Sequence, residues 1–339
     1  MNSLLILLTL SFLVGCSSSW IPENEAFLPT SIATSNSLNI KFLGVSNIYL
    51  NDGKTSLLVD GFFSRLGASA IIHGLETDTK AVDAVLQKAE ITNLNALLVA
   101  HTHFDHILDT EYIAKKMSTG QDVPTKILGA ELGRDIIIDH EYFAVIDGET
   151  IKVGEFKVTF IETPHVRKTK RVEIFEKIHL WATRGQKYEE VGENFSFYIE
   201  HRFGNVLIVP SASYFPNKFE GLKADIIFLG TGLVGNRGID YVYKYWDETV
   251  GLSGAKLVVP IHWDNFFKPL SEKLIPASDL VDDLRLTMSA FHEKAKATPD
   301  VEIYLMHPFK NVNLQEALDC SASNKGSIET HKKRSNLEC

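Results

Sequence analysis

The chain has 339 residues, of which 45% are hydrophobic and 23% charged, and its formal net charge is −9 at pH 7. These proportions are ordinary for a folded globular protein and exclude the collagen-like, disordered and coiled-coil classes. The acidic balance without a long basic stripe argues against a nucleic-acid partner, and the length allows one large domain or two small ones.

The first predicted element is the apolar run Leu4–Val14. It is too short to span a bilayer as a mature helix, and it predicts a secretory signal in residues 1–15. The run ends in Leu13-Val14-Gly15-Cys16, which resembles the bacterial lipobox, although an ordinary cleaved signal with an incidental cysteine is the alternative. Because Ser17 follows Cys16, we expect an exported outer-membrane lipoprotein that faces the periplasm and is anchored through Cys16.

Residues 16–36 are predicted to be a lipid-anchored linker, and residues 37–308 the folded domain. Strand patterns come first in this domain and then alternate with helix patterns, which favours an α/β protein whose sheets are covered by helices. Short apolar runs between turn residues predict strands at Leu38–Val45, Asn47–Leu50, Thr55–Asp60, Asn95–Ala100, Lys157–Ile161, Phe195–Glu200, Val206–Val209, Asp225–Leu229 and Leu257–Ile261.

Helical spacing of apolar residues predicts two helices, and a third is expected near Asp109–Met117. The first helix follows Asp78, a candidate N-cap, and its apolar face consists of Val82, Val85, Leu86 and Ala89. The last helix covers Asp279–His292, where one face is formed by Leu280, Leu284, Met288 and Phe291.

Two polar segments depart from this alternation. Residues 167–193 are rich in Lys, Arg and Glu and are predicted to be an inserted loop with some helix. Residues 309–339 are predicted to be a poorly ordered polar tail. This tail contains Cys320 and Cys339, which either pair in an oxidising compartment or remain two free thiols.

The densest group of metal-binding side chains is His101-Thr102-His103-Phe104-Asp105-His106, directly after a predicted buried strand. Neutral imidazole and carboxylate are ligands that Zn²⁺ favours. His101 and His103 are two residues apart and point the same way in an extended stretch, whereas Asp105 and His106 lie at the turn into a helix and face a second point. The segment therefore predicts a site for one or two divalent ions rather than a polar loop with incidental histidines.

The pattern His-x-His-x-Asp-His resembles the signature of the metallo-β-lactamase superfamily. The resemblance covers about residues 38 to 308 and implies an αββα four-layer sandwich with metal ions at the edge between two sheets. Two later histidines match family positions, His165 in Thr-Pro-His and His262 in Pro-Ile-His-Trp. The implied ligands are His101, His103 and His165 for one ion and Asp105, His106 and His262 for the other. Each ion keeps an open position, which is typical of catalytic zinc.

Three further residues belong beside the ligands. Asp60 matches the family's Asp that supports the metal loop by hydrogen bonding. Ser211 aligns with a position where the family commonly has a metal-bridging Asp, and a neutral hydroxyl there leaves the site more positive by one charge. Asp264 follows His262 closely and either supports a ligand or lies in a solvated loop.

The resemblance implies hydrolysis by a metal-bound hydroxide, with Asp105 orienting the nucleophile and one or two Zn²⁺, or other divalent ions, as cofactor. The motif Pro-Ile-His-Trp resembles the branch that contains N-acyl-phosphatidylethanolamine phospholipase D-like and ascorbate-phosphate lactonase enzymes. We therefore expect a small-molecule or lipid-like ester, phosphodiester or lactone as substrate. The basic residues Arg167, Lys168, Lys170 and Arg171 either attract an anionic substrate or form a solvated surface.

Two other functions stay open. A non-catalytic, lipid-anchored metal-binding protein is one, because Ser211 replaces the bridging Asp. A β-lactamase is the other. A diiron redox protein is disfavoured, because those relatives usually carry Glu in place of His103 and no flavin domain is present. The oligomeric state is left open.

Overall fold

A computed structural model describes residues 18–65, 67, 70, 72 and 74–325 of the chain. The predicted signal segment, its Cys16 and the predicted partner cysteine, Cys339, lie outside the described residues. None of the described helices combines the length and the apolar composition that crossing a bilayer requires.

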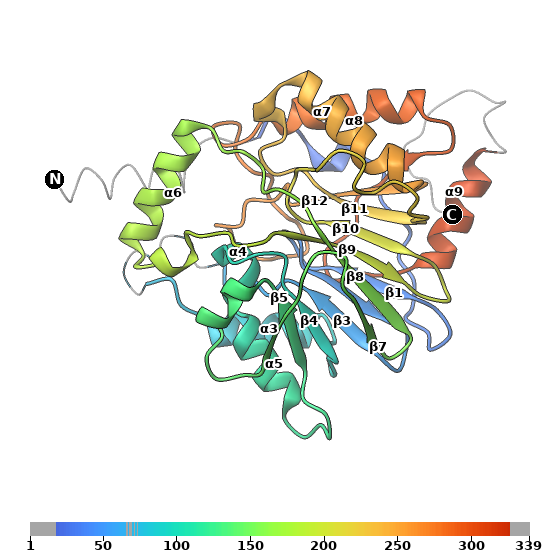
Figure 1. Ribbon diagram of the computed structural model, residues 1–339. Coiled ribbons are helices and arrows are strands. Elements are labelled where there is room, and N and C mark those ends of the chain that lie inside the picture. The colour runs from blue at the N-terminus through green and yellow to red at the C-terminus, as the bar shows by residue number, and fades with distance from the viewer. Residues whose placement is uncertain (1–17, 66, 68–69, 71, 73, 326–339) are drawn as a thin grey trace.

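Two seven-stranded sheets pack face to face in the described part of the chain, and helices cover their outer faces (Figure 1). The first sheet has the order β14-β1-β2-β3-β4-β5-β6. Its strands are β1 (Asn39–Phe42), β2 (Ile48–Asn51), β3 (Ser56–Val59), β4 (Ala96–Leu98), β5 (Lys126–Gly129), β6 (Tyr142–Ala144) and β14 (Asn311–Asn313). The predicted αββα sandwich is confirmed.

The second sheet has the order β13-β12-β11-β10-β9-β8-β7. Its strands are β7 (Thr150–Val153), β8 (Phe156–Glu162), β9 (Phe195–Glu200), β10 (Val206–Val209), β11 (Ile226–Gly230), β12 (Leu257–Ile261) and β13 (Glu302–Ile303). Apolar side chains from both sheets, such as Ile40, Leu98 and Phe197, form one buried cluster. Burial of this apolar area is the main force that holds the layers together.

The helices of the two outer layers are amphipathic and bury one face each. Helices α3 and α5 cover the first sheet, and α7 and α8 cover the second (Figure 1). Their bounds, with those of the remaining helices, are α3 (Thr79–Lys88), α4 (Phe104–Ile107), α5 (Thr110–Ser118), α6 (Lys170–Ala182), α7 (Ile239–Trp246), α8 (Leu284–Ala297) and α9 (Leu314–Lys325). Asp78 caps α3 as predicted, because its side chain accepts hydrogen bonds from the amides of Lys80 and Ala81.

The largest shift from a predicted helix concerns α8, which begins at Leu284 rather than near Asp279. The side chain of Asp283 accepts a hydrogen bond from the Leu286 amide and starts the helix there. Leu280, predicted to lie on the buried face, is instead 38% exposed in the preceding turn. The apolar spacing was therefore extended one turn too far towards the N-terminus.

Both ends of the described chain are more ordered than expected. In the predicted linker, the Trp20 ring packs edge-on against Trp263 at 5.3 Å, and Leu28 is buried. In the predicted tail, β14 pairs antiparallel with β1, and α9 follows. These segments differ from the expectation because a few apolar residues in polar surroundings find partners on the folded domain.

Strand direction brings several strand ends to one edge of the sandwich. Strands β3 and β4 are parallel in the first sheet, and β10, β11 and β12 are parallel in the second. The carboxyl ends of parallel strands meet at the same sheet edge, so residues that follow them gather there. The predicted insert contributes α6, which stands at this edge outside the four layers (Figure 1).

Candidate metal centre

The loop after β4 carries four of the predicted ligands into one small volume. Helix α4 begins at Phe104, so His101 and His103 precede it and Asp105 and His106 lie in its single turn. All four side chains are buried. The apolar strand β4 holds this loop in the core, since the strand itself is fully buried between β3 and β5.

The first group consists of His101, His103 and His165, whose ligand nitrogens lie within 4.8 Å of one another. The His101 Nε2 and His103 Nδ1 atoms are 3.1 Å apart. His165 Nδ1–H donates to the Val166 carbonyl at 2.9 Å, which leaves Nε2 as the free ligand atom. Three imidazole nitrogens thus converge on one point.

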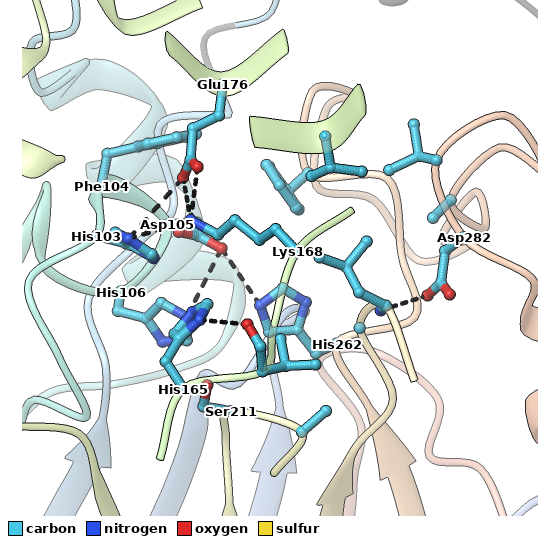
Figure 2. Close-up of a pocket in the computed structure, with 18 of the residues that line it drawn as sticks. His103, Phe104, Asp105, His106, His165, Lys168, Glu176, Ser211, His262 and Asp282 are labelled. Carbon is cyan, nitrogen blue, oxygen red and sulfur yellow. Dashed lines mark hydrogen bonds and ion pairs between the residues drawn. The ribbon is translucent and has the colours of Figure 1, made fainter. Parts of the chain in front are cut away.

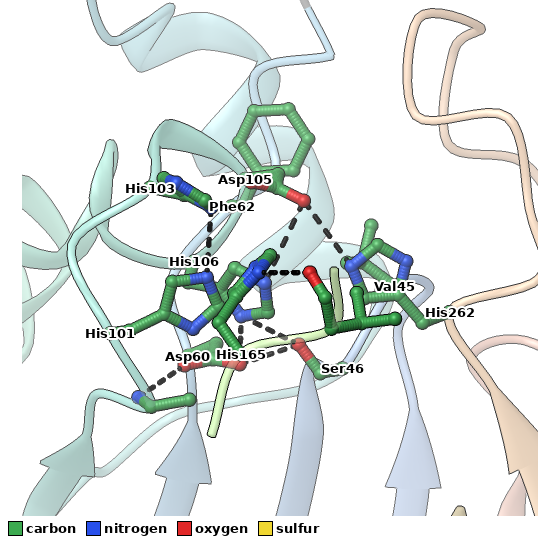
Figure 3. A network of polar contacts seen from close by, with 12 residues as sticks. Val45, Ser46, Asp60, Phe62, His101, His103, Asp105, His106, His165 and His262 are labelled. Atoms are coloured by element: carbon green, nitrogen blue, oxygen red, sulfur yellow. Dashed lines mark hydrogen bonds and ion pairs between the residues drawn. The ribbon is translucent and has the colours of Figure 1, made fainter. Parts of the chain in front are cut away.

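The second group consists of Asp105, His106 and His262, again with ligand atoms within 4.8 Å. Asp105 Oδ2 lies 3.2 Å from His262 Nε2 and 3.6 Å from His106 Nε2. The two groups are adjacent, because the His101 and His106 rings are 4.0 Å apart between centroids. Figure 3 shows the six side chains around a common centre.

Asp60 orients His106 from below (Figure 3). It follows β3 and is fully buried. Its Oδ2 accepts from His106 Nδ1–H at 2.7 Å and from the Ser46 hydroxyl at 2.5 Å, while Oδ1 accepts from the Ala100 amide at 2.8 Å. A carboxylate on Nδ1 fixes the tautomer that leaves Nε2 to bind metal. Asp60 therefore has the place and contacts of a supporting residue.

Burial favours the neutral form of the three histidines in the first group, which is the form that binds metal. Burial lowers the pKa of His101 and of His103 well below the usual value, and it lowers the pKa of His165 to about 3. These imidazoles are therefore neutral at pH 7. Three neutral imidazoles whose nitrogens converge within 4.8 Å form a donor set that fits a bound cation.

The second group contains the site's negative charge. Burial alone would raise the pKa of Asp105, but His106 and His262 outweigh it and lower that pKa far below its usual range. Burial likewise disfavours a charged His106, yet the carboxylates of Asp60 and Asp105 raise its pKa. An ionised carboxylate beside two imidazoles is a ligand set suited to a divalent cation.

Contacts of the backbone fix the position of His262. Its backbone lies in the left-handed region at φ 60°, and its amide donates to the Val45 carbonyl at 2.8 Å. The Val45 amide donates in turn to Asp264 Oδ1 at 2.8 Å, and Asp264 Oδ2 pairs with Arg65 Nη1 at 2.8 Å. Asp264 is buried and braces this loop, instead of lying in a solvated loop or in a ligand group.

Ser211 follows β10 and lines the same cleft as His106 and His262. It is 4% exposed, and its hydroxyl has no hydrogen-bond partner within the described part of the chain. The alignment with the family's bridging position is thus compatible with where the residue lies. It supplies no negative charge there.

We expect Ser211→Asp to retain metal ions longer against a chelator than the unaltered protein, because a carboxylate adds a charged ligand beside the cations. Zinc retained during chelator titration measures this. The matched control is Ser213→Asp, two residues further along the same buried segment. Faster zinc loss from Ser211→Asp than from the unaltered protein would show that Ser211 faces away from the ions.

Sequence reasoning missed the role of the insert. Lys168 Nζ lies 2.6 Å from both carboxylate oxygens of Glu176 on α6 and 3.4 Å from His103 Nε2 (Figure 2). The charge of Lys168 is therefore compensated by Glu176, which weakens its predicted attraction for an anionic substrate. A pairing of residues eight apart across a loop leaves no pattern in the sequence, so no signal in the sequence could have found it.

Comparisons with known proteins agree with this picture. No family model matches the chain. It is 33% identical over 129 residues to UPF0173 metal-dependent hydrolases of Rhizobium meliloti and of Sinorhizobium medicae, which is 38% of this chain and 48% of each relative. The chain thus spans about half the length of the curated relatives it matches.

Solved structures give a second comparison. CmlA, a diiron β-hydroxylase from Streptomyces venezuelae, matches with a TM-score of 0.52 at 13% identity, over 83% of this chain and 54% of CmlA. The metallo-β-lactamase fold protein YhfI from Bacillus subtilis matches with a TM-score of 0.49 at 14% identity, over 81% of this chain and 98% of YhfI. The likeness to CmlA shows a shared fold and carries nothing about the reaction.

Proposed function

We propose that this protein is a metal-dependent hydrolase that cleaves an ester, phosphodiester or lactone. The observation that carries the proposal is the convergence of two adjacent groups of three ligands, the second of which includes one ionised carboxylate. The partial match to two proteins named metal-dependent hydrolases supports it. Three protein ligands per ion leave a position for water or substrate, which is the pattern of catalytic rather than structural sites.

Each residue has a defined part in such a reaction. His101, His103 and His165 would hold one ion, and Asp105, His106 and His262 the other. A bound zinc ion would lower the pKa of a water molecule to about 7 and would polarise the oxygen of the bond to be cleaved. Asp105 would accept a hydrogen bond from the attacking water and orient it. Because Ser211 is neutral, the site would be more positive by one charge than a site with Asp at this position. The added positive charge would stabilise the negative charge of the transition state.

Zinc is the ion we propose, with one or two bound. Imidazole nitrogen and carboxylate oxygen suit Zn²⁺, but they also suit iron and other divalent metals. The shared fold with a diiron protein makes iron the main alternative. Elemental analysis of the purified full chain distinguishes them.

A substrate panel tests the function itself. The metal-loaded full chain is assayed with bis-p-nitrophenyl phosphate, p-nitrophenyl acyl esters, simple lactones and a chromogenic β-lactam. We expect turnover of at least one of the first three classes, and its loss when the metal is removed. Tight metal binding without turnover of any substrate would favour the non-catalytic metal-binding protein, and turnover of the β-lactam alone would favour a β-lactamase.

We also propose that the protein is an exported lipoprotein attached to the membrane through Cys16. This proposal rests only on residues 1–17. A lipid-like substrate and a membrane location agree with one another, but neither is needed for the metal chemistry.

A further inference from the structure

The cleft that contains the ligands is also lined by residues of α6 and of the segment after β12, and Figure 2 shows Glu176 and Asp282 among them. The whole cleft, the ligand groups included, encloses about 900 Å³ of space between atoms, part of which is open to solvent. We call the apolar part of the lining the far end of the cleft. It is formed by Val172, Phe175, Phe266, Phe267, Ala277 and Val281. Six apolar side chains around one space favour an apolar ligand group.

One polar group is placed among these side chains. His179 on α6 lines the cleft and is 2% exposed, with the rings of Phe104, Phe175 and Phe267 at centroid distances of 5.6, 6.2 and 5.1 Å. Neither of its ring nitrogens has a hydrogen-bond partner within the described residues. Burial lowers the pKa of His179 to about 4, so the ring is neutral at pH 7 and offers one donor and one acceptor. A buried polar group without a hydrogen-bond partner lowers the stability of the fold, and a ligand that hydrogen-bonds to it would remove this cost.

The charged side chains that line the described part of the cleft, apart from the ligands, have polar partners within the protein. Lys168 pairs with Glu176. Burial raises the pKa of Asp282 to about 7, and its Oδ2 accepts from the Leu233 amide at 2.9 Å. No uncompensated cation among the described lining residues is available to bind an anionic group at this far end. An uncharged group therefore suits it.

We propose that this far end binds an uncharged, largely apolar acyl group that bears one hydrogen-bonding atom for His179, while the ester to be cleaved lies at the two ligand groups. The inference rests on the proposed hydrolase function and names its substrate class. An acyl group there would bury its methylenes against Phe175 and Phe267. His179 would then select chains with a hydroxyl or carbonyl at the matching carbon.

The first test varies the acyl chain and keeps the leaving group constant. The metal-loaded full chain is assayed with p-nitrophenyl esters of increasing acyl length. The kcat/KM is expected to rise about fourfold per added methylene until the cleft is filled. Phe175→Ser should flatten this rise at unchanged metal content. Ile174→Ser, a neighbour on α6 that is 60% exposed, is the matched control and should keep it. An equal rise in Phe175→Ser and in the unaltered protein, or no rise in either, would overturn the proposal.

The second test concerns His179. Hexanoyl esters with a single hydroxyl at successive carbons are compared, and one isomer is expected to be favoured about tenfold over the unsubstituted ester. His179→Phe should abolish this preference, mainly through KM, and His179→Gln should restore part of it. A preference that is absent, or that persists in His179→Phe, contradicts the role of His179.

A binding measurement separates this inference from the proposed function. N-phenyl-1-naphthylamine, an uncharged apolar fluorophore, is titrated into the metal-free full chain. Saturable binding that weakens at least about fivefold in Phe175→Ser, but not in Ile174→Ser, supports the apolar site even if no ester is hydrolysed. Failure of the probe to bind, or binding that Phe175→Ser leaves unchanged, overturns the site even if hydrolysis is found.

Discussion

Replacing His101 and His103 together with alanine is expected to remove most of the bound metal and to lower hydrolysis by about a thousandfold or more. Both side chains belong to the three-histidine group, and their ligand nitrogens are 3.1 Å apart. The loss also disturbs the adjacent group, since the His101 ring lies 4.0 Å from that of His106. Without metal, the pKa of the attacking water stays at its ordinary high value, and few hydroxide ions form at neutral pH.

Elemental analysis and steady-state kinetics of the full chain measure this effect, with circular dichroism to show that the variant is folded. The matched control replaces His140 and His292, which also make hydrogen bonds but lie outside both ligand groups. The control should keep the metal content of the unaltered protein. Equal metal content in the His101/His103 variant would refute the ligand assignment.

Asp105→Asn is expected to reduce the metal content from two ions towards one and to lower kcat by about 10²–10⁴-fold. The variant replaces the only carboxylate in the two ligand groups by a neutral amide of similar size. The three-histidine group stays intact, so one ion should remain bound. The orientation of the attacking water would be lost together with the second ion.

Asp282→Asn is the matched control for this variant, because Asp282 is also a buried carboxyl that lines the cleft but belongs to neither ligand group. Metal content and kcat are measured for both. Should Asp105→Asn keep two ions and full kcat, Asp105 would be neither a ligand nor an orienting group.

The parts of the site that could be predicted are those coded locally. His101, His103, Asp105 and His106 stand within six residues, directly after an apolar strand, so their convergence follows from a short stretch of backbone. His165 and His262 each follow a predicted strand, and the structure brings them to the same edge. Strand β10, whose four residues are all apolar, was predicted with the observed bounds.

The parts that could not be predicted depend on contacts between distant segments. The cleft wall joins Phe175 and His179 of a polar insert to Phe266 and Phe267, about ninety residues later in the chain. The apolar residues of α6 are spread around the helix instead of lying on one face, so periodicity does not show that the helix covers the site. Equally, nothing near Asp264 in the sequence indicates its buried ion pair with Arg65.

The central claim is that two adjacent three-ligand groups each hold a metal ion. Anomalous X-ray diffraction from crystals of the zinc-loaded full chain, recorded at the zinc absorption edge, tests it most directly. We expect two peaks. One should lie about 2.0–2.1 Å from the ligand nitrogens of His101, His103 and His165, and the other at a similar distance from Asp105, His106 and His262. Peaks that lie elsewhere, or no peak at either group, would contradict the claim.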